Sequence, residues 1–194
     1  MENTITIKDT TANPAPLGLL GFWMTTVLLN IHNAWFFELN AMIMGMGIFV
    51  WWIAQVIAGM QERKKNNTFW ATAFTAYGFF RIALVTTWIL PKLNLWITKA
   101  DELSMWFFLA IWGLFTLFMF IWTLKINKAL QIVFGSLTVL FALLAIGDFT
   151  WIGLIKTIAG YEWIFCGLSA IYACAAQILN ETYWKTILPL WKIK

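Results

Sequence analysis

Charged residues are scarce in this sequence, and that scarcity excludes most soluble folds. Asp, Glu, Lys and Arg together make up 11% of the 194 residues, whereas soluble globular domains contain roughly 25%. A net charge of +4 would raise the question of nucleic-acid binding in a soluble protein. Here the basic residues lie in short stretches between apolar segments, which indicates membrane topology instead. We therefore expect no nucleic-acid partner.

The residue patterns of common enzymes and metal sites are also missing. A single histidine leaves no HExxH motif and no histidine-rich metal site. The sequence contains no GxSxG, no Walker motif and no dinucleotide-binding glycine pattern. Cys166 and Cys174 are too far apart on one helix to form a disulfide, at about 12 Å along its axis. We expect no catalytic residues, no cofactor and no bound metal.

Long apolar segments dominate what is present, and hydrophobic residues form 61% of the chain. About 20 such residues in a helix cross the roughly 30 Å hydrocarbon core of a bilayer. The pattern predicts an all-α integral membrane protein with six transmembrane helices. The predicted spans are 17–34, 40–60, 69–90, 104–124, 129–148 and 159–180. They form one transmembrane domain, residues 17–180, between an N-terminal tail of residues 1–16 and a C-terminal tail of residues 181–194.

The loop charges predict the orientation. Loops and tails on one side contain nine basic residues, and those on the other contain three, namely Lys92, Lys99 and Lys156. The positive-inside rule then places both tails in the cytoplasm, and we expect a multi-pass protein of the cell inner membrane. Many of the fourteen tryptophans lie at span ends, as aromatic belts do. Trp51 and Trp52 lie mid-span and are expected to face lipid or a neighbouring subunit.

An ordered set of short motifs covers nearly the whole chain. The set begins with the heptapeptide that starts at Asn13, continues through five of the six predicted spans and ends at the start of the C-terminal tail. The motifs are NPAPLGL, TTVLLNIHN, TAFTAYGFF, WGLFTLFMF, SLTVLFALLAIG and LNE. In order and spacing they resemble the acetate uptake transporter family, which includes the bacterial succinate–acetate permeases and fungal relatives.

The resemblance implies a fold and a function. It implies a six-helix protomer, assembled as a homo-hexamer, with a conducting path through each protomer. The substrates it implies are acetate and, in some members, succinate or other small carboxylates, with transport that is proton-linked or channel-like. Two alternatives stay open: an acetate-sensing membrane protein that does not transport, and a urea-type channel for a neutral solute.

The resemblance also implies which residues border the path. A narrow hydrophobic constriction in bacterial relatives carries over to Phe22, Tyr77 and Leu137, and a small residue of the last span carries over to Ala170. Phe22, Tyr77 and Leu137 lie well inside their spans. An apolar collar there would pass a small, partly desolvated acid and reject hydrated ions. The simpler interpretation is that Phe22 and Leu137 only pack.

The first span offers polar candidates for the same path. Asn13 can cap the first helix, and as part of the NPAPLGL signature it is also a candidate path residue. Thr25 and Asn30 could each offer a hydrogen bond to a carboxylate, or could instead tie helices together. His32 lies near the outer end of this span, where it could titrate in the physiological range or simply solvate the helix end.

Arg81 is a charged residue in the middle of the third span. An arginine at a helix centre costs about 2.5–3.5 kcal/mol on insertion scales, so we expect its side chain to face the interior, water or an acidic partner. Arg81 follows Tyr77 by one helical turn and could bind a carboxylate in a charge-assisted pair. Members of the resembled family usually have Trp at this position. A salt bridge to Asp148 or to a second subunit is the alternative.

Overall fold

The computed structural model describes residues 11–33, 36–93, 95–150 and 152–193. Its helical elements within these ranges are α1 (Ala15–Asn33), α2 (Ala41–Gly45), the π-helix η1 (Met46–Trp52), α3 (Ile53–Lys64), α4 (Thr68–Ile89), the 3-10 helix η2 (Leu90–Lys92), α5 (Glu102–Thr123), α6 (Lys128–Thr150) and α7 (Gly153–Thr182). Among the described residues, six helical stretches are long and apolar enough to cross a membrane. The predicted six-helix fold class is confirmed.

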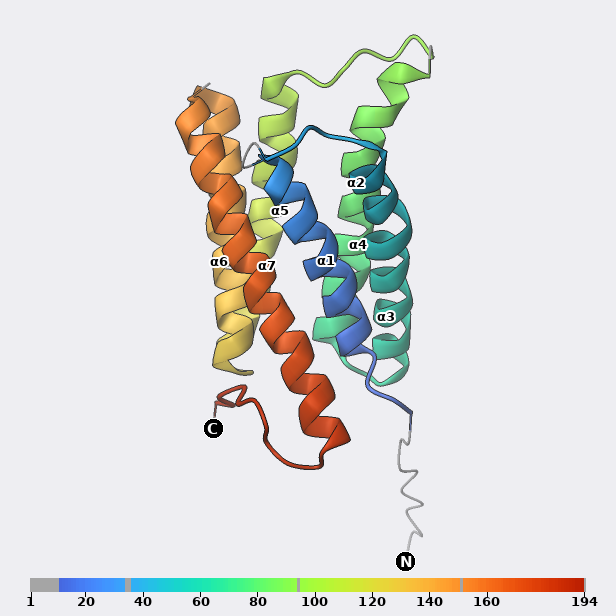
Figure 1. The fold of residues 1–194 in the computed structure, drawn as a ribbon, viewed down its shortest axis with the longest axis vertical. Helices are drawn as coiled ribbons and strands as arrows, with labels where there is room; N and C mark the ends of the chain where they lie inside the picture. Colours follow the sequence, from blue (N-terminus) through green and yellow to red (C-terminus); the bar gives the residue numbers. More distant parts are fainter. Residues whose placement is uncertain (1–10, 34–35, 94, 151, 194) are drawn as a thin grey trace, which may run out of the picture.

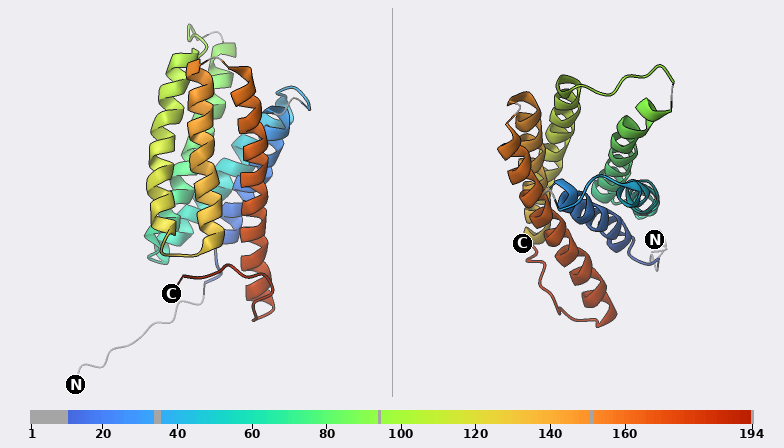
Figure 2. Two further views of the ribbon diagram at one scale, coloured as in Figure 1. Left: turned by 90° about the vertical axis from the view of Figure 1, so that its left-hand side faces the viewer. Right: turned by 45° about the horizontal axis from the view of Figure 1, so that its top comes forward.

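The central helix of the bundle is α1. It packs along α7 on one side and against η1 and α3 on the other (Figure 1). Two further pairs, α3 with α4 and α5 with α6, flank this centre, and α6 also packs against α7. The start of α1 and the tail that follows α7 lie at the same end of the bundle (Figures 1 and 2).

The second span is one continuous helical stretch made of α2, η1 and α3. Its middle turns, Met46–Trp52, are π-helical, and such segments are rare and concentrate at functional sites. Hydrophobic periodicity alone gives no sign of this change, because a π-helix keeps the span apolar and helical.

Side-chain caps define several helix starts. The Asn67 carboxamide accepts a hydrogen bond from the backbone of Trp70 at the start of α4. At the start of α5, the Asp101 carboxylate accepts from the backbone N–H of Ser104 at 2.7 Å. Hydrogen bonds from Ser104 lower the pKa of the Asp101 carboxyl below its ordinary value. Polar residues in the connections thus define where the next span begins.

Glycines allow the helices to approach closely. A Cβ on Gly18 of α1 would lie 2.5 Å from the Phe74 ring of α4, and one on Gly59 of α3 would lie 2.3 Å from Oγ1 of Thr75. In lipid, helices associate through such packing and through interhelical hydrogen bonds, because the tails around them are equally apolar.

The last helix is longer than its apolar run suggests. It begins at Gly153, whereas the hydropathy pattern predicts a start at residue 159. Lys156 interrupts the apolar run, so the sequence pattern places it in a loop. In the structure it belongs to α7, because a charged residue near a helix end does not terminate the helix. The connection between α6 and α7 is correspondingly short.

Candidate functional site

A narrow cavity lies between α1, α3, α4 and α6 near the centre of the bundle. Its volume is about 20 Å³, enough for about one water molecule. Its lining side chains are hydrophobic or aromatic apart from one glutamine. They are Leu19, Phe22, Gln55, Trp70, Ala73, Phe74, Tyr77, Val133, Phe134 and Leu137. This set is called the narrow cavity below.

The three predicted constriction residues all line the narrow cavity. Phe22 comes from α1, Tyr77 from α4 and Leu137 from α6. Each side chain is at most 5% exposed. The structure therefore brings together, at one small cavity, three residues that are distant in sequence.

The hydroxyl of Tyr77 has a partner inside the protein. It donates a hydrogen bond to Oγ1 of Thr116 on α5 at 2.9 Å. The Thr116 hydroxyl in turn donates to the carbonyl oxygen of Trp112 at 2.7 Å. The Tyr77 proton is thus not available to a passing molecule in this conformation, and the wall at this point is more apolar than the sequence suggests.

Gln55 is a buried polar residue of the narrow cavity that the sequence analysis missed. Its Oε1 accepts a hydrogen bond from the indole N–H of Trp51, and its Nε2 donates to the carbonyl oxygen of Gly18 at 3.3 Å. It therefore ties α3 to α1 at the cavity wall. A lone amide within an apolar span was the signal that could have identified it, since polar groups are costly in lipid.

Trp51 corrects one expectation. It does not face lipid, because its side chain is only 2% exposed within the protomer. Its ring meets Phe22 edge-on at a centroid distance of 5.1 Å. Because this tryptophan lies in the π-helix η1, its direction could not be derived from a 3.6-residue period.

Arg81 is fully buried next to Trp51. Its guanidinium carbon lies 4.8 Å from the Trp51 ring centroid and 5.9 Å from that of Trp88. None of the three guanidinium nitrogens has a hydrogen-bond partner in the described part of the chain, so the pair with Asp148 is not formed there. Gly47 of η1 makes room for the group, because a Cβ there would lie 2.8 Å from Nε of Arg81.

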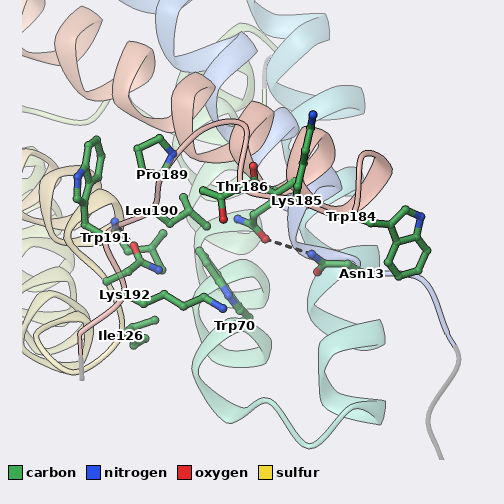
Figure 3. Close-up of a pocket in the computed structure, with 14 residues that line it drawn as sticks. Asn13, Trp70, Ile126, Trp184, Lys185, Thr186, Pro189, Leu190, Trp191 and Lys192 are labelled. Atoms are coloured by element: carbon green, nitrogen blue, oxygen red, sulfur yellow. Dashed lines mark hydrogen bonds between the residues drawn. The ribbon is translucent and has the colours of Figure 1, made fainter.

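A wide opening, called the vestibule below, lies at the end of the bundle that holds the start of α1 and the C-terminal tail (Figure 3). Its volume is about 710 Å³. The beginnings of α1, α4 and α6, the end of α7 and the tail supply its walls. The lining residues are Asn13, Trp70, Ile126, Asn127, Leu130, Gln177, Asn180, Trp184, Lys185, Thr186, Pro189, Leu190, Trp191 and Lys192.

The vestibule and the narrow cavity share a wall. Trp70 lines both, and its ring stacks on Phe74 at a centroid distance of 4.5 Å. On α6, Leu130 lines the vestibule, while Val133 and Leu137 line the narrow cavity on the following turns. The wide vestibule and the apolar narrow cavity thus follow one another along α4 and α6.

Of the predicted path residues Ala170 and Asn13, only Asn13 lines one of the two spaces. Ala170 of α7 is fully buried but is not among the residues that line either space. Asn13 lines the vestibule, where its Nδ2 donates to Oε1 of Gln177 at 3.3 Å. Its Oδ1 accepts from the backbone of Ala15 at 3.1 Å, in agreement with a capping role.

The other polar candidates of α1 make local hydrogen bonds. Thr25 donates to the carbonyl oxygen of Gly21 at 2.9 Å, and Asn30 donates to that of Thr26. Nδ1 of His32 lies 2.8 Å from the carbonyl oxygen of Phe37 and must carry the proton, because a carbonyl only accepts. None of the three lines the narrow cavity or the vestibule.

Within the described residues, six membrane-length helices enclose a narrow apolar cavity next to a wide vestibule, an architecture of polytopic membrane proteins of the transporter and channel class. The chain belongs to the GPR1/FUN34/yaaH family, whose profile matches residues 2–193. The resemblance to the acetate uptake transporters is thereby confirmed.

Similar proteins cover almost the full chain. The succinate-acetate/proton symporter SatP of Escherichia coli is 52% identical over 180 residues, which are 92% of this chain and 95% of SatP. A protein of Methanothermobacter thermautotrophicus is 48% identical over 194 residues, 97% of this chain and 95% of its own. A solved structure of the bacterial acetate channel SatP superposes with a TM-score of 0.91 at 51% identity, covering 93% of this chain and 99% of that one.

Proposed function

We propose that this protein carries acetate, and other small carboxylates such as succinate, across a cell membrane through a path in each protomer. The observation that supports this most is the convergence of Phe22, Tyr77 and Leu137 on one narrow cavity that adjoins a wide vestibule. Relatives named as an acetate symporter and an acetate channel give the substrate class.

The narrow cavity selects by size and by the cost of dehydration. Its walls offer almost no polar atoms, so a solute must leave most of its water behind, which is expensive for a hydrated ion. A two-carbon acid has a methyl group that suits the apolar wall and a single charge that proton uptake can remove. The volume of about 20 Å³ is smaller than acetate, so side chains move when the substrate passes.

Arg81 lies on α4, one helical turn after Tyr77. This turn is on the side of the constriction that faces away from the vestibule. A buried guanidinium without hydrogen-bond acceptors is costly, and the contacts with Trp51 and Trp88 offset only part of that cost. In this proposal Arg81 binds the carboxylate that emerges from the constriction. Its side chain has no exposed surface in the protomer, which disfavours a direct contact with a second subunit.

Topology and assembly belong to the same proposal. Both tails face the cytoplasm of an inner-membrane protein, because the helix ends on their side hold the larger number of basic residues. The vestibule then opens to the cytoplasm. The protomers form a homo-hexamer, and exposed apolar faces such as that of α5, with Phe107, Ile111 and Leu114, meet lipid or neighbouring protomers.

Uptake of labelled acetate into proteoliposomes tests the function. Purified, folded protein is expected to carry acetate faster than empty liposomes do. Repeating the assay with and without a pH gradient separates proton-linked transport, which accelerates, from a channel, which follows the acetate gradient alone. Absence of uptake would favour a sensor, and uptake of urea without acetate would favour a channel for neutral solutes.

A further inference from the structure

The C-terminal tail is a fixed wall of the vestibule. Its first half is held by the carboxamide of Asn180, the residue near the end of α7. The amide Nδ2 donates to the carbonyl oxygen of Leu188 at 2.8 Å. The Oδ1 atom accepts from the backbone of Ile187 at 2.7 Å and from that of Leu188 at 3.0 Å. One half-buried side chain thus folds the tail back toward the bundle.

The second half of the tail is bonded to the start of α6. Asn127 and Lys192 form an antiparallel bridge, and the backbone N–H of Lys128 donates to the carbonyl oxygen of Trp191 at 3.1 Å. The Trp191 ring stacks on Tyr172 of α7 at a centroid distance of 5.8 Å. The tail therefore crosses the vestibule from α7 to α6 and keeps its side chains in defined places.

The charged side chains that line the vestibule are all positive. Its lining contains Lys185 and Lys192 and no Asp or Glu. Both lysines come from the tail, but they point differently. The side chain of Lys192 extends toward Trp70, whereas that of Lys185 points away from the pocket (Figure 3). Trp70 is the residue shared with the narrow cavity, so Lys192 places its ammonium group on the way to the constriction.

We propose that Lys192 is a carboxylate-collecting residue of the vestibule, which draws small mono- and dicarboxylates from the cytoplasm toward Trp70 and the narrow cavity. This inference rests on the proposed function and on its orientation. A cleft lined by one sign of charge raises the local concentration of the opposite ion and its rate of association. The main chain of Lys192 anchors the tail through its bridge to Asn127, and the residue is exposed, so its side chain can take this role.

The test uses inside-out membrane vesicles that contain the full-length protein, so that the vestibule faces the medium. Initial rates of labelled acetate and succinate uptake are measured at about 0.01 M salt, where the Debye length is about 30 Å, and at about 1 M, where it is about 3 Å. Lys192→Gln is expected to raise KM at low salt on the order of fivefold, the factor of one unit-charge contact in water, and to leave the maximal rate unchanged. The doubly charged succinate should be affected more than acetate, and the difference should vanish at high salt.

Two further variants distinguish charge from structure. Lys192→Arg keeps the charge and should behave like the wild type. Lys185→Gln removes an equal charge from the same tail, but from a side chain that points away from the pocket, and should change KM less. An unchanged KM in Lys192→Gln, or equal impairment by Lys192→Arg, would overturn the role of Lys192 while wild-type transport stands. Failure of the wild type itself to transport acetate would instead overturn the proposed function.

Discussion

The hydroxyl of Tyr77 donates a hydrogen bond to Oγ1 of Thr116, 2.9 Å away on the neighbouring helix. Of Phe22, Tyr77 and Leu137, Tyr77 alone has a polar side chain, and this bond occupies its proton. It also joins α4 to α5, two helices that meet through aromatic side chains as well, such as Phe80 and Trp112 at a centroid distance of 4.9 Å. We therefore propose that Tyr77 acts in the path through its ring, while its hydroxyl serves the packing of the bundle.

Tyr77→Phe should accordingly preserve acetate flux and reduce stability slightly. The loss is expected to be about 0.6 kcal/mol, the average for interhelical hydrogen bonds in membranes, and is measurable as a lower unfolding midpoint in detergent. Thr116→Val removes the same bond from the other side and is the matched control. If folded Tyr77→Phe protein no longer carried acetate, the hydroxyl would have to contact the substrate.

Leu137→Ala should admit larger acids. Removing the Leu137 side chain beyond Cβ enlarges a cavity that now holds about one water molecule. Propionate and butyrate are therefore expected to gain flux relative to acetate, as competition assays in proteoliposomes can measure. Val139→Ala is the control, because Val139 lies on the same helix but is 53% exposed on its outer face. The same substrate profile in Leu137→Ala as in the wild type would count against a constriction at Leu137.

Arg81→Trp tests the carboxylate site that we propose beyond the constriction. A hydrogen bond to a charged group contributes roughly 1.5–3 kcal/mol, so its loss should raise KM for acetate at least about tenfold. Assembly should stay intact, because the side chain is buried within the protomer. The KM for acetate and, by size-exclusion chromatography, the oligomeric state are measured on the same preparation. Dissociation of the oligomer with an unaltered KM would assign Arg81 to subunit contacts instead.

Gly47→Ala should disturb Arg81 without changing any charge. The added methyl group would lie 2.8 Å from Nε of Arg81, so the guanidinium must shift from between Trp51 and Trp88. A rise in KM like that of the Arg81 variant, but smaller, is expected in the proteoliposome assay. Gly45→Ala, two residues earlier, has nothing within 4 Å of the new Cβ and should be silent. Equal behaviour of the two variants would mean that the position of Arg81 does not matter to transport.

The spans could be predicted from the sequence because a single physical requirement produces them. Crossing a bilayer demands a continuous apolar helix, and the runs that end at the Arg63–Lys65 cluster or begin after Asp101 meet that demand visibly. The constriction residues followed from motif resemblance rather than from physics. Phe22 and Leu137 are apolar residues in apolar spans, and nothing in their pattern separates a path wall from a packed core.

Other features depend on tertiary structure. Trp51 lies in the π-helical η1, so its inward direction does not follow from a 3.6-residue period. The vestibule is formed by a tail that Asn180 and Asn127 hold in place across the bundle end. These hydrogen bonds leave no periodic signal, so the sequence showed only a short tail with lysines.

The most direct measurement of the central claim is acetate flux through a Leu137→Cys variant, made in a background in which Cys166 and Cys174 are replaced by Ala. A small thiol-modifying reagent is added, and flux and the modified fraction are followed on the same sample. If the substrate passes between Phe22, Tyr77 and Leu137, flux falls in proportion to modification, and added acetate slows the modification. A fully modified sample that still carries acetate at the starting rate would contradict a path through this cavity.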